Sequence, residues 1–272
     1  MSRAPVHFIL HVPKCAGTTV ERHFASALGE GFLIAPRWES VWRNVLGNRY
    51  PYTPADPALA GVHVVSGHSL SRSLGRAFAG RRVEASVLLR DPIGYHLSLY
   101  NYRWGWHRAG KAPRPPEFAR WYGVQRRNPI ARFLLSRYFE QGVPALYRLS
   151  SAGRLAYLEA RLAGFLFVGG HDRAAEMIGG ISRRLGVGET VESRNVTAVK
   201  VVTAEGLGAD WQARILADNA LDAVLHARWR DRGWRGEVDQ DGGAPLPALP
   251  HYDHARLLWA DTASAVAKKL VG

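Results

Sequence analysis

Residues 6–24 read Val-His-Phe-Ile-Leu-His-Val-Pro-Lys-Cys-Ala-Gly-Thr-Thr-Val-Glu-Arg-His-Phe, and this stretch decides the fold. Its first part is a short apolar run rich in β-favouring residues, which predicts a buried central strand. Pro13 has no N–H to give to a strand ladder, so the strand should end there. The next apolar residues recur four positions apart, which predicts one face of a helix beginning near Thr18: Val20, Phe24 and Leu28.

The loop between this strand and helix has the features of an anion cradle. A helix that follows a strand and a short loop turns its unpaired N–H groups and its positive dipole end toward the loop. Thr18 and Thr19 stand where these N–H groups begin, and Lys14 adds a full positive charge. We therefore predict a phosphate or sulfate site here. Taken alone, the segment is also compatible with an ordinary turn that carries a surface lysine.

The spacing of the loop distinguishes it from the common nucleotide loop. The pattern G-x-x-x-x-G-K-[S/T] has its lysine directly after the second glycine, whereas Lys14 precedes Gly17. Pro-Lys-x-x-Gly-Thr-Thr after a first strand instead resembles the 5′-phosphosulfate loop of sulfotransferases that use 3′-phosphoadenosine 5′-phosphosulfate (PAPS). The resemblance implies that the following residues hold the 5′-phosphosulfate: Lys14, Cys15, Ala16, Gly17, Thr18 and Thr19.

Length and composition are those of a soluble globular protein. The 272 residues are 47% apolar and 22% charged, which suits one large domain with a sizeable core. No apolar run reaches the ~20 residues that a membrane span needs. The first strand begins within about five residues of the N-terminus, which leaves no room for a signal peptide. We therefore expect a cytoplasmic protein without a transmembrane segment.

The chain is strongly basic, with a formal net charge of +13. Such a balance favours acidic partners such as nucleotides or anionic polysaccharides, although a general enrichment in arginine would give the same sum. The basic residues are scattered without a long run, so we expect no nucleic-acid partner. Cys15 is the only cysteine, which excludes an intramolecular disulfide and a cysteine-based zinc site.

Short apolar strands alternate with helical patterns along the rest of the chain. Further strands are expected at 31–34, 62–66, 83–89 and 165–168. Helices are expected from Asp91-Pro92 onward, with Asp91 as the cap, at 130–140 and 144–162, from Asp172, as the cap, to Gly186, and at 209–218, 220–230 and 252–270. Irregular segments are expected at 37–60, 104–125 and 189–205, with a Gly/Pro-rich linker at 236–250. This alternation predicts a single α/β domain, 1–272, around a mostly parallel sheet. The sulfotransferase resemblance implies the P-loop-NTPase-like three-layer α/β/α version of that class.

A second motif follows the predicted strand 83–89. Arg90 stands at the carboxyl end of this strand, where ligands bind in open α/β sheets, and Ser98 lies two helical turns further on. A guanidinium fork matches phosphate, and a hydroxyl can add a donor. Arg-Asp-Pro with a serine eight residues after the arginine resembles the 3′-phosphate-binding segment of PAPS-dependent sulfotransferases. Without the Lys14 loop, Arg90 could equally be a surface ion-pair partner.

A third motif, Ser66-Gly67-His68, ends the predicted strand 62–66. A Gly-His at this position supplies the catalytic base in the carbohydrate branch, which includes heparan sulfate and uronyl 2-O-sulfotransferases. The resemblance therefore implies that His68 is the base. A histidine after a strand is more often structural, and His11, just before the loop, is the other candidate.

The second half of the chain resembles the family more weakly. Phe167-Val168-Gly169 followed by a helix is similar to a later strand of the family, and the polar segment after residue 189 is similar to its nucleotide-contacting loop. This likeness implies three further contacts to the 3′-phosphate or adenine: Arg194, Thr197 and Lys200.

The implied activity is transfer of the sulfuryl group from PAPS to a hydroxyl, with adenosine 3′,5′-bisphosphate (PAP) as the product. Lys14 and the loop N–H groups would stabilise the departing 5′-phosphate, so no metal is required. The acceptor is expected to be a carbohydrate; a lipid-linked sugar, a small metabolite or an amine stays open. A P-loop kinase-like phosphotransferase and a non-catalytic binder of anionic polysaccharide are the alternatives. Cys15, beside a helix start and a lysine, is expected to have a lowered thiol pKa and to be reactive.

Overall fold

The computed structural model describes residues 3–36, 50–140, 149–189 and 200–235. The expected linker 236–250 and helix 252–270 therefore lie outside the described residues. So do residues 37–49 of the first expected loop, most of 189–205, and residues 144–148 of an expected helix.

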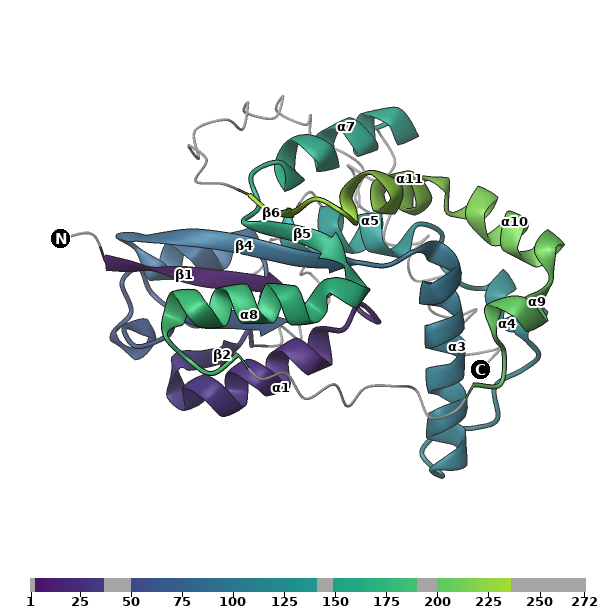
Figure 1. Cartoon of the computed structure of the whole chain (residues 1–272), viewed down its shortest axis with the longest axis horizontal. Coiled ribbons are helices and arrows are strands. Elements are labelled where there is room, and N and C mark those ends of the chain that lie inside the picture. Colours follow the sequence, from purple (N-terminus) through teal and green to yellow (C-terminus); the bar gives the residue numbers. More distant parts are fainter. Residues whose placement is uncertain (1–2, 37–49, 141–148, 190–199, 236–272) are drawn as a thin grey trace.

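One six-stranded sheet forms the centre of the molecule (Figure 1). Its strands, in the order in which they lie side by side, are β2 (Phe32–Ile34), β3 (Val64–Gly67), β1 (Arg3–Leu10), β4 (Arg81–Leu89), β5 (Phe167–Gly170) and β6 (Gly233–Trp234). All neighbouring pairs are parallel except β5 with β6. The expected mostly parallel sheet is confirmed. The short antiparallel strand β6 was not foreseen.

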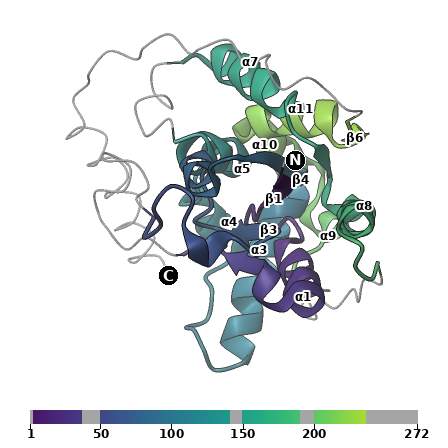
Figure 2. The same cartoon turned by 90° about the vertical axis from the view of Figure 1, so that its left-hand side faces the viewer.

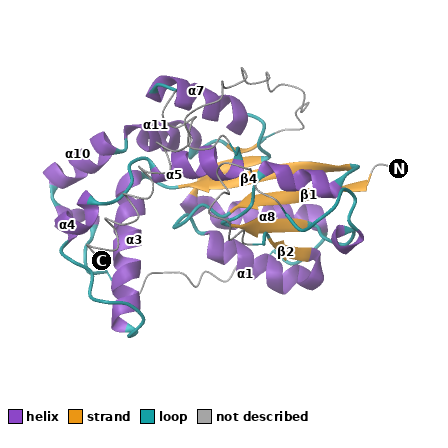
Figure 3. Ribbon diagram, turned by 180° about the vertical axis from the view of Figure 1, so that it is seen from behind, coloured by secondary structure: helices purple, strands orange, loops and turns teal. Residues whose placement is uncertain are grey.

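The helices fill most of the remaining described chain (Figure 3). The α-helices are α1 (Gly17–Leu28), α3 (Pro92–Arg108), α4 (Phe118–Gly123), α5 (Pro129–Phe133), α7 (Ser151–Leu162), α8 (Ala174–Leu185), α9 (Ala204–Leu207), α10 (Ala209–Asp218) and α11 (Ala220–Trp229). Short 3₁₀ helices span Gly29–Gly31, Pro57–Leu59, Arg72–Phe78 and His171–Arg173, and Leu134–Tyr138 forms a π-helical turn.

Helices lie on both faces of the sheet. Helices α1 and α8 lie against one face, whereas α5, α7 and α11 lie on the other side (Figures 1 and 2). Strands β3 and β5 and the last four residues of β4 are fully buried, because both faces of the sheet pack against helices. This is an α/β protein compatible with a three-layer arrangement. Its likeness to P-loop NTPases stays a prediction.

The order of the strands creates a topological switch point beside β1. The chain leaves β1 toward β2 and β3 on one side, and then crosses to β4 and β5 on the other. Ligands of open α/β sheets bind outside the carboxyl ends of the strands at such a point. A ligand of this sheet is therefore expected beside the residues that directly follow β1, β3 and β4.

A second apolar cluster lies beyond the carboxyl ends of the strands, where α3, α4 and α10 meet (Figure 1). Its buried members are Leu97, Tyr100, Phe118, Trp121, Tyr122 and Ile215. The expectation of a loop over 104–125 is wrong at both ends, because α3 continues to Arg108 and α4 occupies Phe118–Gly123. Burial of these aromatic rings outweighs the irregular sequence pattern.

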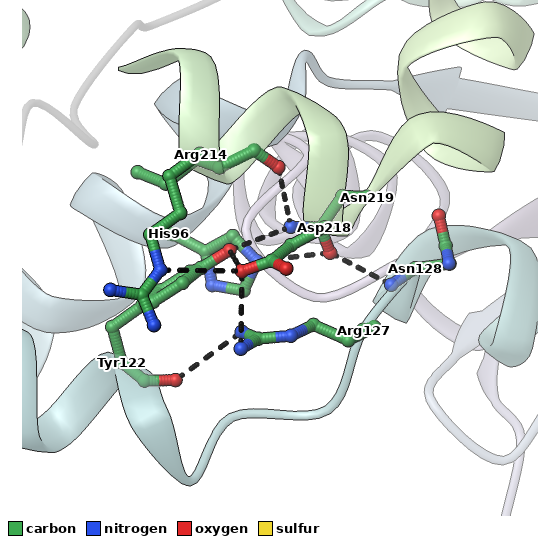
Figure 4. Close-up of polar contacts among 8 residues, drawn as sticks. His96, Tyr122, Arg127, Asn128, Arg214, Asp218 and Asn219 are labelled. Carbon is green, nitrogen blue, oxygen red and sulfur yellow. Dashed lines mark hydrogen bonds and ion pairs between the residues drawn. The ribbon is translucent and has the colours of Figure 1, made fainter. Parts of the chain in front are cut away.

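A polar cluster joins α10 and α11 to α3, α4 and α5 (Figure 4). We call it the junction cluster; it contains His96, Tyr122, Arg127, Asn128, Arg214, Asp218 and Asn219. Buried Asn219 accepts the backbone N–H of Asn128 at 2.8 Å and donates to the Tyr122 hydroxyl at 3.1 Å. That hydroxyl donates to Asp218, which also pairs with Arg127 at 3.1 Å. The cluster satisfies buried polar groups that would otherwise destabilise the fold.

The start of α3 and the two ends of α8 can be compared with the helix boundaries expected from the sequence. Asp91 caps α3 as expected, because its carboxylate accepts the N–H of Gly94 at 2.6 Å. The expected cap Asp172 is wrong: it lies within a 3₁₀ turn, so Arg173 occupies the N-cap of α8 without a side-chain hydrogen bond. Gly186 ends α8 in the left-handed conformation, as expected.

None of the helices in the described segments is long and apolar enough to cross a membrane.

Candidate anion-binding and catalytic site

The register of the sheet brings the ends of β1 and β3 together. Leu10, the last residue of β1, pairs with Gly67, the last residue of β3. The next residue of each strand, His11 and His68, is therefore adjacent, and the two imidazole centroids lie 3.9 Å apart. Arg90 follows β4 on the other side of β1. Three neighbouring strand ends thus carry the side chains singled out in the sequence.

The loop after β1 has a constrained backbone. Lys14 and Ala16 both have a φ of 64°, in the left-handed region that residues with a side chain rarely adopt. Alternation of left-handed and ordinary residues turns successive N–H groups toward one point, which is a common anion-binding geometry. Helix α1 then begins at Gly17 with Ala16 as its N-cap, and no side chain caps it. The N–H groups of Thr19 and Val20 donate to the Ala16 carbonyl, so Gly17 and Thr18 are the first residues of α1 whose N–H groups precede these bonds and face the loop.

Arg90 lies across this loop and binds its backbone. Its Nη1 donates to the carbonyl oxygen of Lys14 at 2.9 Å, whereas its Nε is buried without a hydrogen-bond partner. Burial lowers the pKa of the guanidinium. The adjacent Asp91 is occupied as the cap of α3. A buried, partly unsatisfied guanidinium is a group that an incoming anion would stabilise.

Lys14 shares this electropositive environment. Burial and, next, the nearby Arg90 lower the pKa of its ammonium group. Its Nζ lies 3.9 Å from the centre of the Tyr102 ring on α3. Within the chain segments that the structure describes, no carboxylate lies within ion-pair distance of Lys14 or Arg90. Two cations are thus held side by side without an anion from these segments.

His68 is exposed at the end of β3, and its ring has a defined orientation. Its Nδ1 lies 2.8 Å from the carbonyl oxygen of His11, which can only accept a hydrogen bond. The proton of the neutral ring is therefore assigned to Nδ1, so Nε2 is the basic nitrogen. The ring also stacks on the imidazole of His11. These two contacts fix the ring in the orientation that a general base needs.

His11 is attached to a carboxylate that the sequence analysis did not single out. Its Nδ1 donates to Oε1 of Glu21 at 2.7 Å, and the same oxygen accepts the Ser66 hydroxyl at 3.1 Å. A Cβ on Gly17 would overlap the His11 ring, so a glycine is required there by close approach. The spacing Gly17 to Glu21, one helical turn, is the signal that could have placed this carboxylate beside the loop.

The other expected site residues have different positions. Ser98 is buried on α3, two turns after Arg90, and no hydrogen bond fixes its hydroxyl among the described residues. Lys200 is exposed, and Asn101 of α3 binds the N–H groups of the next residues, Val201 at 3.0 Å and Val202 at 3.1 Å. Lys200 therefore lies near α3. Arg194 and Thr197 lie outside the described residues.

The expected reactivity of Cys15 is wrong. Its side chain is buried, and burial raises the pKa of the thiol even though Arg90 and Lys14 act in the opposite direction. Neither Thr18 nor Thr19 caps α1, because the cap position falls on Ala16. The N–H of Cys15 already donates to the carbonyl of Val12 at 3.2 Å, so the backbone donors that this loop offers are those of Ala16, Gly17 and Thr18.

His171 adds a further group at this edge of the sheet. It follows β5 directly, and its Nδ1 is buried without a hydrogen-bond partner. Burial and, next, the nearby Arg90 lower the pKa of its imidazole, which favours the neutral ring. The strand before it was expected to end two residues earlier, so His171 was not recognised as a residue at a strand end.

Two comparisons with known proteins found no match: no protein-family model matches the sequence, and no curated protein matches it either. Among the described residues, no group of three or more His, Cys, Asp or Glu side chains is arranged to hold a metal ion.

Proposed function

We propose that the protein is a sulfotransferase that moves the sulfuryl group of PAPS to a hydroxyl group of a carbohydrate. The observation that carries the proposal is the contact between Arg90 and the Lys14 loop, which holds two cations together at an uncapped helix start. A ligand with two separate anionic groups, such as the 5′-phosphosulfate and 3′-phosphate of PAPS, matches this arrangement.

The donor would lie across the ends of β1 and β4. Lys14 and the backbone N–H groups from Ala16 to Thr18 would bind the 5′-phosphosulfate, because the N–H groups of Cys15 and Thr19 already donate to the carbonyls of Val12 and Ala16. Arg90 and Ser98 would bind the 3′-phosphate, with Lys200, Arg194 and Thr197 as further contacts to that phosphate or to the adenine. Binding energy at the 3′-phosphate would orient the sulfuryl group for attack.

The reaction is an in-line transfer. The acceptor oxygen forms a bond to sulfur while the bond from sulfur to the bridging oxygen breaks, and the electron pair leaves with the 5′-phosphate of PAP. Negative charge builds up on that phosphate, so a fixed ammonium group and oriented N–H groups lower the barrier. Positive charge from Lys14 and α1 supplies this stabilisation without a metal.

His68 would accept the proton that the acceptor hydroxyl loses. Its Nε2 is basic because Nδ1 donates to the His11 carbonyl, and the ring is exposed to an incoming substrate. A neutral imidazole is suited to proton uptake near pH 7.

A pair of exposed aromatic rings supports a carbohydrate as the acceptor. Tyr102 and Trp106 are one turn apart on α3, with ring centroids 5.2 Å apart and exposed fractions of 40% and 44%. Tyr102 also contacts Lys14, so the pair extends from the proposed sulfuryl site. Amphipathic rings of this kind give a sugar ring a flat surface to pack on, and the net charge of +13 favours an acidic sugar.

The test is transfer of label from sulfur-labelled PAPS to a panel of acceptors, including polysaccharides, lipid-linked sugars, small alcohols and amines. The expected result is labelled product with a carbohydrate, and a loss of about 100-fold or more in His68→Ala with PAP binding retained. His63→Ala, just before the amino end of β3, is the matched control. Full turnover by His68→Ala would remove His68 as the base; no transfer to any acceptor would contradict the proposed function.

A further inference from the structure

The Glu21 carboxylate is bonded to His11, whose ring packs against that of His68. Its Oε1 accepts from His11 Nδ1 at 2.7 Å and from Ser66 Oγ at 3.1 Å. His11 in turn supports His68 twice, through its carbonyl at 2.8 Å and through its ring. Ser66 lies on β3, two residues before His68, so one carboxylate contacts both the residue that orients His68 and the strand that precedes it.

The folding of the chain explains this convergence. Helix α1 packs against β3, and Glu21 is one turn after Gly17, so its side chain reaches the ends of β1 and β3. The missing Cβ at Gly17 gives the His11 ring its space. Glu21 and His11 are both largely buried, with side-chain exposures of 19% and 9%, so their interaction is less screened by water than a surface pair.

We propose that Glu21 is a positioning residue for the transfer reaction, and that its negative charge balances the proton that His68 takes up. This inference rests on the proposed function. When the acceptor O–H bond breaks, its proton moves to His68 Nε2 and an imidazolium forms against the His11 ring. A carboxylate bonded to that neighbouring ring stabilises the new positive charge, and it holds His11 in one tautomer. Glu21 from α1 contacts the His11 ring directly, and Ser66 from β3 contacts Glu21.

Glu21→Gln separates charge from geometry, because the amide oxygen can still accept from His11 and Ser66. We expect its kcat to fall roughly tenfold or more and the acid limb of its pH–kcat profile to move to lower pH, because the imidazolium loses its counter-charge. Its affinity for PAP should stay within about twofold. Ser66→Ala, which keeps the charge, should lose less, and Glu30→Gln, an exposed residue of the 3₁₀ turn after α1, is the matched control.

A wild-type rate and an unchanged pH profile in Glu21→Gln, with His68→Ala inactive, would overturn the inference and leave the proposed function standing. If the wild type transfers no sulfuryl group, the proposed function fails instead. In that case, nitrogen NMR of the imidazole rings tests whether Glu21 positions His11. A proton that is fixed on His11 Nδ1 in the wild type and lost in Glu21→Ala supports this role, and identical spectra of the two proteins overturn it.

Discussion

The site at the strand ends and the junction cluster are both rich in charged and polar side chains, but their charges are balanced differently. In the junction cluster, Asp218 lies between Arg127 at 3.1 Å and Arg214 at 3.9 Å (Figure 4). At the strand ends, burial lowers the pKa of both Lys14 and Arg90, the nearby Arg90 lowers that of Lys14 further, and no carboxylate from the described segments pairs with them. The charges of the junction cluster are paired within the protein, whereas those at the strand ends are arranged for an anion from outside.

Because of this difference, mutations in the two regions should affect different properties, namely folding stability in the junction cluster and function at the strand ends. Removing one partner from a satisfied buried network leaves other polar groups unpaired, which costs folding free energy. Removing a cation that burial already disfavours has no such cost. The junction cluster should therefore tolerate mutation poorly in folding assays, whereas the strand-end site should tolerate it poorly in binding and turnover assays.

The largest expected effect is that of Lys14→Met on turnover. We expect kcat to fall by about 100- to 1,000-fold, because the departing 5′-phosphate loses its nearest fixed charge. The melting temperature should stay the same or rise, because burial and Arg90 both oppose the ammonium charge. Rate measurements and thermal unfolding check this, with the exposed Lys111→Met as control. Unchanged turnover with a lowered melting temperature would reverse the assignment.

Asn219→Ala is the counterpart in the junction cluster. Its carboxamide binds the N–H of Asn128, the hydroxyl of Tyr122 and the carbonyl of Ile215, so its loss should cost about 2–4 kcal/mol of unfolding free energy. Denaturant titration measures this cost. PAP affinity of the folded protein should be unchanged, and Asp210→Ala at the exposed start of α10 should have little effect. Equal losses of affinity and stability would mean that the two regions are not separable.

Gly17→Ala tests the close packing beneath the loop. The added methyl group would overlap the His11 ring, so we expect a destabilisation of about 1–3 kcal/mol and weaker PAP binding. Gly105→Ala on α3 is a strict comparison, because nothing lies within 4 Å of its added methyl group and alanine favours helix. Calorimetric unfolding should separate the two variants; equal stability would show that His11 does not occupy this position.

A smaller effect is expected from the pH dependence of Asp222, which is buried beside the junction cluster and accepts the N–H groups of Ile130 at 2.9 Å and Ala131 at 2.8 Å. Burial raises the pKa of its carboxyl to about 7, against the effect of those two hydrogen bonds. Between the usual pKa of an aspartate and 7, the folded state binds the extra proton, so lowering the pH through 7 should stabilise the fold.

Comparison of the wild type with Asp222→Asn between pH 8 and pH 5 isolates this contribution. The free energy of unfolding of the wild type should rise relative to that of the variant as the pH falls. A constant difference across that range would show that Asp222 does not titrate there.

The sequence was sufficient for the parts of the site that depend on local signals. Apolar runs ended by Pro13 and by Asp91-Pro92 located β1 and β4, and therefore the positions of Lys14 and Arg90 at adjacent strand ends. The apolar periodicity also predicted α10 and most of α8. These features depend on neighbours within a few residues, which a sequence displays directly.

Features that depend on distant contacts were missed. The bond between His11 and Glu21 requires the register of β1 with β3 and the packing of α1, neither of which is visible in a short window. The thiol of Cys15 was expected to respond to nearby cations, but its burial dominates. Helix α4 has no apolar period of its own and is stabilised by contacts of its aromatic rings with α3 and α10.

Calorimetric titration with PAP, set against ATP with magnesium, tests the central claim most directly. We expect PAP to bind without a metal and more tightly than ATP with magnesium. Arg90→Ala should weaken PAP binding by about 30-fold or more, because a buried charge pair with the ligand is lost. Tighter binding of ATP with magnesium would indicate a phosphotransferase. Binding of an anionic polysaccharide with no affinity for PAP would contradict the account and indicate a non-catalytic binder.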